Sequence, residues 1–332
     1  MTSDTVQGGP AGAAAPPRPL TFTEPEPEPE PHRKRRRRQS GRRNDPRLFL
    51  FLIPAGVIYL WLVLWPTLQA FRFSLTDWDG LSATFNEVGL GNYRRLFGGD
   101  SVFTQAVGNS FKFMLAVVIG QTTLSLVLAL ALQRNTRTNI ALRALYFFPT
   151  VLSSVSVAFV WSFVYDPTFG LANTLLSAVG LESWQQPWLG DQSLAIYYLA
   201  IVQIWFHAGQ MMVVYIAGLQ TIPPELYEAV DLDGANRWQR FRYLTWPLVA
   251  PATAIVVAYT TIQSFKAFDL IYASTGGGPN HATEILSTLI YNSAFRTFEF
   301  GYAAAQSVIF VLVVALVTVL QRRAVALSSR GG

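Results

Sequence analysis

Six long stretches of the chain contain no charged residue, and the charged residues gather in the segments between them. Each stretch has at least 21 residues, and a helix of about 20 apolar residues crosses the hydrocarbon core of a membrane. A buried soluble helix of that length would normally carry a polar stripe, and these stretches carry none. The pattern predicts an all-α, polytopic membrane protein with six transmembrane helices. The predicted spans are 48–71, 113–133, 144–165, 194–219, 244–266 and 301–321.

Basic residues predict the orientation of this six-span domain, residues 48–323. Beyond the first 47 residues, the segments on the side of the two termini carry nine Lys and Arg residues, and the longer segments on the opposite side carry six. Basic residues near the ends of spans are retained in the cytoplasm. Both termini, including the short tail 324–332, are therefore predicted to be cytoplasmic, and segments 72–112, 166–191 and 266–299 to face outward.

The N-terminal tail, residues 1–47, holds ten basic and six acidic residues and so supplies +4 of the formal net charge of +5. A Glu-Pro repeat over residues 24–30 precedes an arginine-rich block at 33–38. This composition predicts a disordered cytoplasmic tail whose arginines hold the end of the first span. Binding of the block to anionic lipid or nucleic acid is the alternative. The rest of the chain is nearly neutral, so no nucleic-acid partner is expected.

Residue types that carry out common catalytic chemistry are absent or scattered. The chain has no cysteine, which excludes disulfides, thiolate zinc sites and cysteine nucleophiles. None of its three lysines lies in a phosphate-binding loop of the G-x-x-x-x-G-K-[ST] type. Its three histidines are too far apart in sequence to suggest a shared metal site. The chain is predicted not to be an enzyme and to bind no cofactor of its own.

Segment 220–247 is predicted to form an elbow between two helices, and it holds seven of the chain's charges. Thr221 can cap a helix whose first turn contains Pro223 and Pro224. Gly234 is expected to end this helix in the left-handed conformation, and a second helical segment continues into the fifth span past Pro247. Apolar residues at i, i+3 and i+4 spacing face outward between the charges, which is typical of a partner-binding surface. A helix lying on the bilayer surface is the alternative.

This segment resembles the "EAA" loop of ABC importer permeases, whose pattern is E-A-A-x3-G-x9-I-x-L-P. The chain has Glu228-Ala229-Val230, three residues, Gly234, nine residues and then 244–247, Leu-Thr-Trp-Pro. The three departures from the pattern are all apolar. The resemblance implies that the loop forms a coupling helix that docks in a cleft of a separate ATPase subunit. The implied ATPase-coupling residues are Glu228, Ala229, Val230, Asp233, Gly234, Ala235 and Pro247.

The resemblance covers most of residues 48–321. Segments 74–79, 143–149, 170–173 and 217–223 resemble motifs of the family, and 268–269, 275–279 and 301–302 are similar to its carbohydrate-uptake subfamily. Within that subfamily the chain resembles the sugar or glycerol-3-phosphate permease subunit that pairs with a second, different permease.

The resemblance also implies a set of partners and a location. It implies a heterodimer with a homologous permease, two ATPase subunits that bind ATP and Mg²⁺, and an extracytoplasmic solute-binding protein. It places this chain in the cell membrane of a prokaryote. The chain would form half of the pathway for a sugar or a sugar-like solute and would contact membrane lipid.

Polar and aromatic residues within the spans are the candidates for contact with solute. For the glutamines, hydrogen bonding between helices is equally compatible with the sequence, and His207 in mid-span is expected to make a structural hydrogen bond or to face a cavity. Lys266 and Asp269, at i, i+3 spacing, predict a salt bridge. The candidates for the substrate pathway are Gln121, Trp205, Tyr259, Gln263 and Gln306.

Two other classes of membrane protein remain as alternatives. An ion-coupled secondary transporter would show internal repeats and carboxylates at mid-membrane depth, and the sequence shows neither. A structural membrane protein would need no coupling loop.

Overall fold

The structure is a computed structural model that describes residues 52–328. The predicted N-terminal tail, 1–47, and the last four residues of the C-terminal tail lie outside the described residues. The chain divides into two units, Met1–Gly56 and Val57–Gly332, and the second unit contains the helices that pack against one another. Within the described range, the elements are helical, apart from an isolated β-bridge between Thr76 and Glu87.

Five helices of this part of the chain are long and apolar enough to cross a membrane. Two of them contain a π-helical turn, η1 or η5, immediately before a Trp-Pro pair. Because proline lacks the N–H that an α-helix needs at that position, a π turn allows the helix to continue. The long helices are Leu52–Phe73 (α2 Leu52–Tyr59, η1 Leu60–Leu64, α3 Trp65–Phe73), α5 Ser101–Leu132, α9 Ala195–Gln220, Arg237–Phe265 (α11 Arg237–Gln239, η5 Arg240–Thr245, α12 Trp246–Phe265) and α15 Phe300–Ser328.

The stretch predicted as the third span, 144–165, is not one straight helix. It lies across α6 (Arg137–Phe147), the short helix η2 (Phe148–Val151) and α7 (Ser154–Val164), and the two arms are bent by 99°. The backbone is extended at Leu152 and Ser153, which ends one helix and begins the next. Counting the bent pair as one span gives six spans; counting continuous helices alone gives five.

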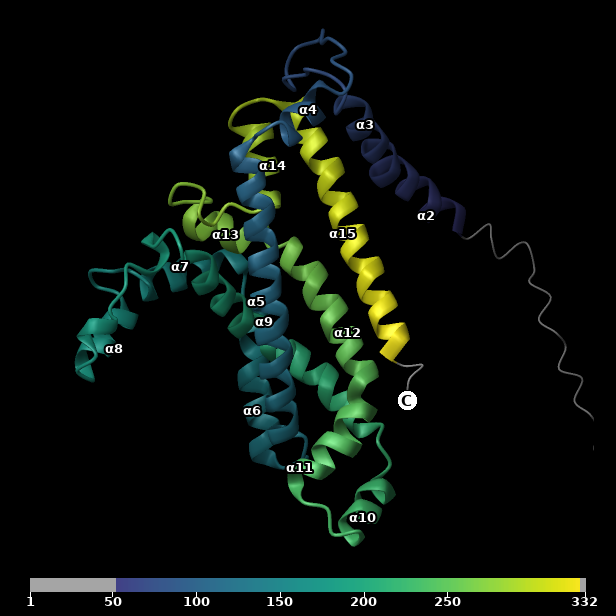
Figure 1. The fold of residues 1–332 in the computed structure, drawn as a ribbon, viewed down its shortest axis with the longest axis vertical. Coiled ribbons are helices and arrows are strands. Elements are labelled where there is room, and N and C mark those ends of the chain that lie inside the picture. Colours follow the sequence, from purple (N-terminus) through teal and green to yellow (C-terminus); the bar gives the residue numbers. More distant parts are fainter. Residues whose placement is uncertain (1–51, 329–332) are drawn as a thin grey trace, which may run out of the picture. The chain divides into compact units, whose positions relative to one another are not determined.

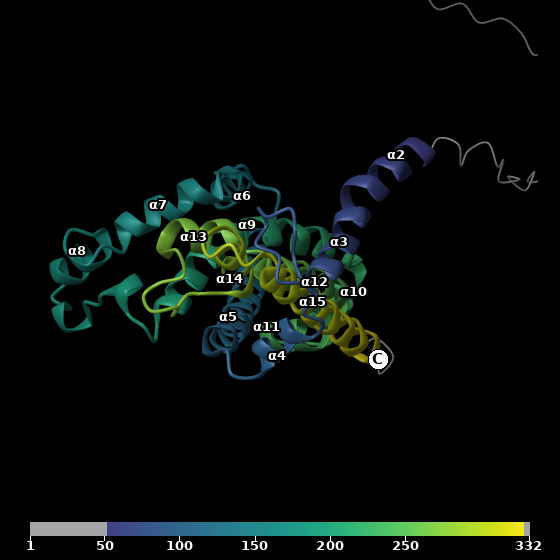
Figure 2. The ribbon, with the colours of Figure 1, turned by 90° about the horizontal axis from the view of Figure 1, so that it is seen from above.

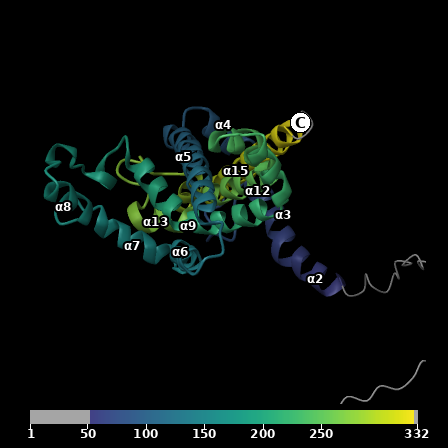
Figure 3. The same cartoon turned by 90° about the horizontal axis from the view of Figure 1, so that it is seen from below.

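Short helices occupy the connections. In Figure 1, α10 and α11 lie at one end of the long helices, and α4 and α14 lie at the other. Helix α8 extends away from α12 and α15 when the unit is seen from above (Figure 2) and from below (Figure 3). The short helices are α4 Gly91–Phe97, α8 Leu171–Ala178, η3 Glu182–Trp184, η4 Trp188–Gly190, α10 Pro224–Leu232, α13 Phe268–Thr275 and α14 Leu286–Phe295.

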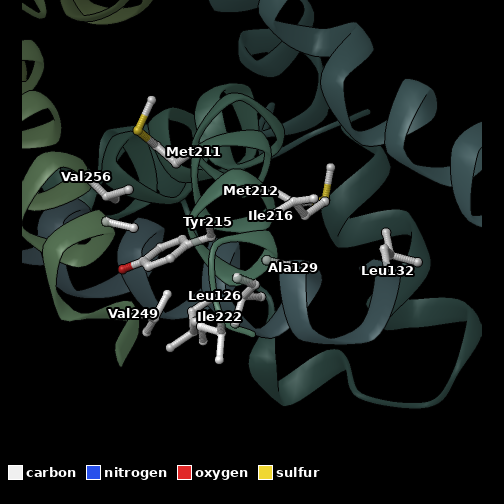
Figure 4. Close-up of a cluster of buried hydrophobic side chains, with 12 residues drawn as sticks. Leu126, Ala129, Leu132, Met211, Met212, Tyr215, Ile216, Ile222, Val249 and Val256 are labelled. Atoms are coloured by element: carbon white, nitrogen blue, oxygen red, sulfur yellow. The ribbon is translucent and has the colours of Figure 1, made fainter. Parts of the chain in front are cut away.

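Helices α5, α9 and α12 pack against one another around the largest buried cluster of the unit. Tyr215 of α9 is fully buried and projects between Val249 and Val256 of α12 (Figure 4). Gly218 permits this close packing, because a Cβ atom there would lie 2.5 Å from the Cβ of Ala252. Small residues at such contacts let helices approach within a lipid environment, where dispersion forces hold them together.

The first long helix packs differently from the others. None of the residues in the apolar window of Leu52–Phe73 is buried, and only its last part, α3, packs against α15. Its apolar side chains therefore require lipid or another protein chain as their surroundings.

Candidate functional site

The elbow between α9 and α12 is built from short-range backbone hydrogen bonds. Helix α10 ends at Leu232, and Gly234 has a φ of 75°. The N–H of Ala235 donates to the carbonyl of Val230, and the N–H of Gly234 donates to the carbonyl of Asp231, which is the Schellman pattern. The predicted left-handed turn at Gly234 is thus confirmed.

Capping at the two ends of the elbow differs in part from the prediction. Thr221 does not cap α10: its hydroxyl donates to the carbonyl of Gly218 at 2.7 Å and closes the end of α9. Asn236 begins α11 with a capping box, because its backbone and side chain bond reciprocally with Gln239 at 2.8 and 2.9 Å.

Three contacts among four side chains fasten α10 to η5, at the base of α12. The hydroxyls of Tyr227 and Thr245 lie 3.3 Å apart, and Arg240 forms an ion pair with Asp231 at 3.2 Å. The Arg240 guanidinium also lies 5.7 Å from the centre of the Tyr227 ring. Tyr227 and Phe241 pack against the buried cluster of α5, α9 and α12. The elbow is therefore joined to α12 by its own side chains.

The elbow exposes large apolar side chains as well as charged ones. Leu232 is 89% exposed, Trp238 68% and Tyr243 76%. Of the predicted coupling residues, Val230 and Ala235 are half-buried by the turn; the other members of the set are exposed, namely Glu228, Ala229, Asp233, Gly234 and Pro247. An exposed apolar surface rimmed by charge is typical of a protein-binding site.

A cavity of about 420 Å³ lies where the start of α7, α9, α12 and the start of α13 meet. We call it the central cavity. Two of the predicted pathway residues, Tyr259 and Gln263, line it. The other polar residues of its lining are Ser154, Gln203, His207, Lys266 and Asp269.

Polar groups of the central cavity are only partly paired with one another. His207 Nδ1 lies 3.4 Å from the carbonyl of Gln203, so His207 both makes a helix hydrogen bond and faces the cavity. The amide of Gln210 donates to the Tyr259 hydroxyl at 3.3 Å. The side-chain oxygen of Gln263 is buried without a partner among the described residues. Such amides are available to a polar solute.

The predicted salt bridge between Lys266 and Asp269 is wrong. Lys266 ends α12 and Asp269 lies in the first turn of α13, so the two residues belong to different helices and the i, i+3 geometry does not apply. Asp269 instead accepts a hydrogen bond from Ser154 at 3.1 Å. Both charged side chains line the central cavity.

The remaining pathway candidates lie elsewhere. Gln121 is fully buried in α5 with neither side-chain amide atom paired within the described part. Trp205 does not line the central cavity and packs edge-on against Trp161, with ring centres 5.5 Å apart. Gln306 lines a second cavity near the start of α15. The roles of all three in solute passage stay predictions.

The structure adds residues that the sequence pattern did not single out. Gln203 precedes His207 by one helical turn, and this i, i+4 spacing could have revealed a shared face. Ser154 reaches the central cavity only because the third span bends. No group of three His, Asp or Glu residues gathers to form a metal site between residues 52 and 328.

Comparisons with known proteins agree with this arrangement. Residues 121–327 match the family described as binding-protein-dependent transport system inner membrane component. The multiple sugar-binding transport system permease protein MsmF of Streptococcus mutans is 33% identical over 271 residues, covering 82% of this chain and 92% of that protein. A probable ABC transporter permease of Pyrococcus horikoshii is 36% identical over 275 residues, covering 83% and 94%.

A solved structure shares the fold. A chain of the bacterial ABC transporter that imports the acidic polysaccharide alginate superimposes with a TM-score of 0.73 at 22% identity, covering 86% of this chain and 96% of that one. The extent of the family match and the identity to these relatives fix the family. The chain belongs to the binding-protein-dependent transport system inner membrane components, the multi-pass permeases of bacterial and archaeal cell membranes.

Proposed function

We propose that this permease is one half of the translocation pathway of an ATP-driven importer for a sugar or a sugar-like solute, and that the elbow at α10 and α11 receives the work of a separate ATPase. The observation that carries the proposal is the exposed apolar surface of the elbow, which is fastened to the same long helix that lines the central cavity. A force on the elbow therefore acts directly on a wall of the cavity.

ATP and Mg²⁺ are assigned to the partner ATPase. The sequence has no phosphate-binding loop with its lysine, so the chain would depend on mechanical contact for energy. Two copies of the ATPase, closing on ATP, would draw together the elbows of this chain and of a second, homologous permease. This arrangement requires both termini and the elbow to face the cytoplasm, as the distribution of basic residues predicts.

The other proposed partners are a second permease and an extracytoplasmic binding protein. The first long helix buries none of its apolar window against its own chain, as expected of a helix that packs on the second permease or on lipid. Solute would arrive from an extracytoplasmic binding protein. In support, a chain of the alginate transporter bound to a pentasaccharide-loaded periplasmic protein has the same fold, with a TM-score of 0.71.

A neutral, hydroxyl-rich solute suits the central cavity. Its side walls carry amides and a hydroxyl, from Gln203, Gln263 and Tyr259, and one charge of each sign, from Lys266 and Asp269. Hydroxyl groups both donate and accept hydrogen bonds, so they match amides that do the same. The relative from S. mutans is named for sugar transport, which agrees with this chemistry.

Substitutions in the elbow test the proposed coupling. Glu228→Ala should release the ATPase and abolish uptake, whereas Glu225→Ala, on the first turn of the same helix and equally exposed, should change neither. The measurements are copurification of the ATPase with the chain and ATP-dependent uptake of labelled oligosaccharides by vesicles. Normal uptake with retained ATPase in the Glu228→Ala variant would refute the docking role.

Gly234 provides a second, conformational test. A Cβ atom at this position meets nothing within 4 Å, so a substitution would act only through the left-handed backbone conformation. Gly234→Val should strain the turn by about 1–2 kcal/mol and impair coupling, while Gly234→Asn, which tolerates this conformation, should retain it. Equal uptake by the two variants would show that the turn does not matter for coupling.

The rival ion-coupled mechanism gives the opposite result in vesicles. Uptake that continues without ATP and collapses when a proton or sodium gradient is dissipated would overturn the proposal.

A further inference from the structure

A second cavity, of about 600 Å³, lies between the α4–α5 connection, α14 and the start of α15. We call it the outer cavity, because the proposed orientation puts this end of the unit outside the cell. It is larger than the central cavity. It shares no lining residue with the central cavity, so it is a separate space.

Ionic and hydrogen-bonded pairs hold the walls of the outer cavity. Arg95 binds Glu299 through two hydrogen bonds of 2.8 and 3.1 Å. The Tyr302 hydroxyl donates to the Asp100 carboxylate. This bond lowers the pKa of Asp100, although burial opposes it more strongly than any other single influence. Charges are thus paired across neighbouring helices, and the walls are fixed before any ligand arrives.

A buried carboxylate forms another part of the lining. Glu284 is only 2% exposed; it accepts a hydrogen bond from the Asn292 amide at 3.0 Å and lies 3.2 Å from Nδ1 of His281. A buried carboxylate is costly unless it is hydrogen-bonded, and these two contacts satisfy it only in part, because each oxygen can accept further bonds.

Unpaired amide atoms also line the outer cavity. Gln306 is fully buried beside the Tyr302 hydroxyl, and neither its amide nitrogen nor its oxygen makes a hydrogen bond of ordinary geometry among the described residues. The side-chain oxygen of Asn292, on the facing helix, is likewise buried and unpaired. Leaving a buried polar group unsatisfied costs about 1–3 kcal/mol, so these atoms are suited to a ligand that enters the cavity.

The donors and acceptors together define the ligand. Three carboxylates and two amide oxygens make the cavity rich in acceptors, which disfavours an anion. The carboxylates already have partners, so a full positive charge is not required. Hydroxyl groups both donate and accept hydrogen bonds, so a ligand that carries them suits this lining. The volume of the outer cavity falls within the range of small-molecule sites, about 300–1,000 Å³.

We propose that the outer cavity is a receiving site for the solute, binding a neutral polyhydroxyl compound such as an oligosaccharide before it reaches the central cavity. The inference rests on the proposed function for the identity of the solute, and on Gln306 and Asn292 for the site itself.

A group of aromatic rings lies beside the central cavity and reaches α14. Phe268 lines the central cavity, and its ring centre lies 5.0 Å from that of Tyr272 and 5.1 Å from that of Tyr291. Tyr291 belongs to α14 and directly precedes Asn292 of the outer cavity. Partly exposed rings of this kind offer apolar faces to the C–H surfaces of a sugar ring.

Single-cysteine labelling tests the outer site, because the natural chain has no cysteine. Ser101→Cys places a thiol at the outer cavity, Ser154→Cys places one at the central cavity, and Ala83→Cys is an exposed control outside both. Right-side-out vesicles holding the complete importer, without binding protein, are treated with a membrane-impermeant maleimide. The probes are maltotriose, raffinose and N,N′-diacetylchitobiose, whose ATP-driven uptake is measured in a second portion of the same vesicles to which the purified binding protein has been added.

A transported probe should slow labelling of Ser101→Cys about tenfold at ten times its Kd and leave Ala83→Cys unchanged. Adding Gln306→Leu should raise the Kd of the probe roughly five- to tenfold, so the same probe concentration should then slow labelling only about two- to threefold. Gln321→Leu, the same change on α15 far from the outer cavity, should not weaken the protection. Comparison of the two variants distinguishes a general effect of losing an amide on α15 from an effect that is specific to the outer cavity.

Three results would overturn the outer site while the proposed function stands: a transported probe that protects Ser154→Cys alone, protection at Ser101→Cys that Gln306→Leu leaves undiminished, or protection given only by the purified binding protein. The last would identify the outer cavity as a protein-docking surface. Protection at Ser101→Cys in vesicles that show no ATP-driven uptake even after the binding protein is added would support the outer site and overturn the proposed function instead.

Discussion

Gly209 is the position where a single methyl group should do most damage to the fold. A Cβ atom on Gly209 of α9 would lie 2.0 Å from the carbonyl oxygen of Tyr146 and 2.7 Å from the backbone nitrogen of Phe147. Ordinary contact begins at 3.4 Å, so the end of α6 would have to withdraw by about 1.4 Å. The obstacle is backbone, which cannot rotate away as a side chain can.

The cost of Gly209→Ala follows from this geometry. Overpacking costs about 1–3 kcal/mol, and the upper end applies because backbone must move. Withdrawal also breaks the 3.0 Å hydrogen bond from the Thr150 hydroxyl to the carbonyl of Phe206, worth about 1 kcal/mol. Alanine returns roughly 1 kcal/mol through its higher helix propensity. The net loss of stability is about 3 kcal/mol, which corresponds to a fall in Tm of about 5–10 °C.

Gly108→Ala is the matched control for this prediction. Gly108 lies inside α5, and an added Cβ meets nothing within 4 Å, so this variant should gain up to about 1 kcal/mol. Thermal stability is measured in detergent as the fraction of monodisperse protein that remains after heating. If Gly209→Ala were as stable as Gly108→Ala, the close approach of α9 and α6 would not exist in the protein.

Two further predictions concern the end of the unit that carries α4. The Ser82 hydroxyl and the backbone N–H groups of Ser82 and Leu81 bind the Asp79 carboxylate and lower its pKa to about 2. The turn favours the charged form, so its stabilisation is complete above pH 3.8 and lost as pH falls through about 2. Pepsin cleavage at Leu81, normalised to a peptide of the same sequence, should rise progressively as pH falls from about 4 to about 2, and cleavage that stays constant over this range would contradict the prediction. The Arg95–Glu299 pair is half exposed, so a double-mutant cycle should give a coupling below about 1 kcal/mol; a coupling above about 2 kcal/mol would require a much drier site.

The absence of charge predicted most of the helical framework, because a membrane span must exclude charge over its whole length. The absence of charge could not reveal where the chain bends within such a run. The run 144–165 is as free of charge as the others, yet it contains a bend of 99°. In the opposite sense, Lys112 lies inside the long helix α5, so a charge ended the predicted span where the helix itself continues.

Local chemistry was predictable where a short-range rule applies and unpredictable where two segments meet. The left-handed turn at Gly234 follows from the glycine itself. The predicted salt bridge between Lys266 and Asp269 does not form, because the spacing rule assumes that both residues lie in one helix, whereas a helix boundary lies between them. The division of the pathway candidates between two cavities, Gln263 in one and Gln306 in the other, depends on how α12 and α15 are placed against other helices. No periodicity within either helix contains that information.

Because the elbow is attached to α12, a movement of the elbow would tilt this helix. Residues 237–265 form one continuous helical run, about 43 Å long at 1.5 Å per residue. Val249 is fully buried among α5 and α9, so the helix would pivot near this residue. Along the helix axis, Val249 is about 18 Å from Arg237 and about 15 Å from Tyr259. With arms so nearly equal, a displacement of the elbow in one direction would move the cavity wall by a similar distance in the other. One continuous helix could then close the cytoplasmic end of the pathway while it opens the far end.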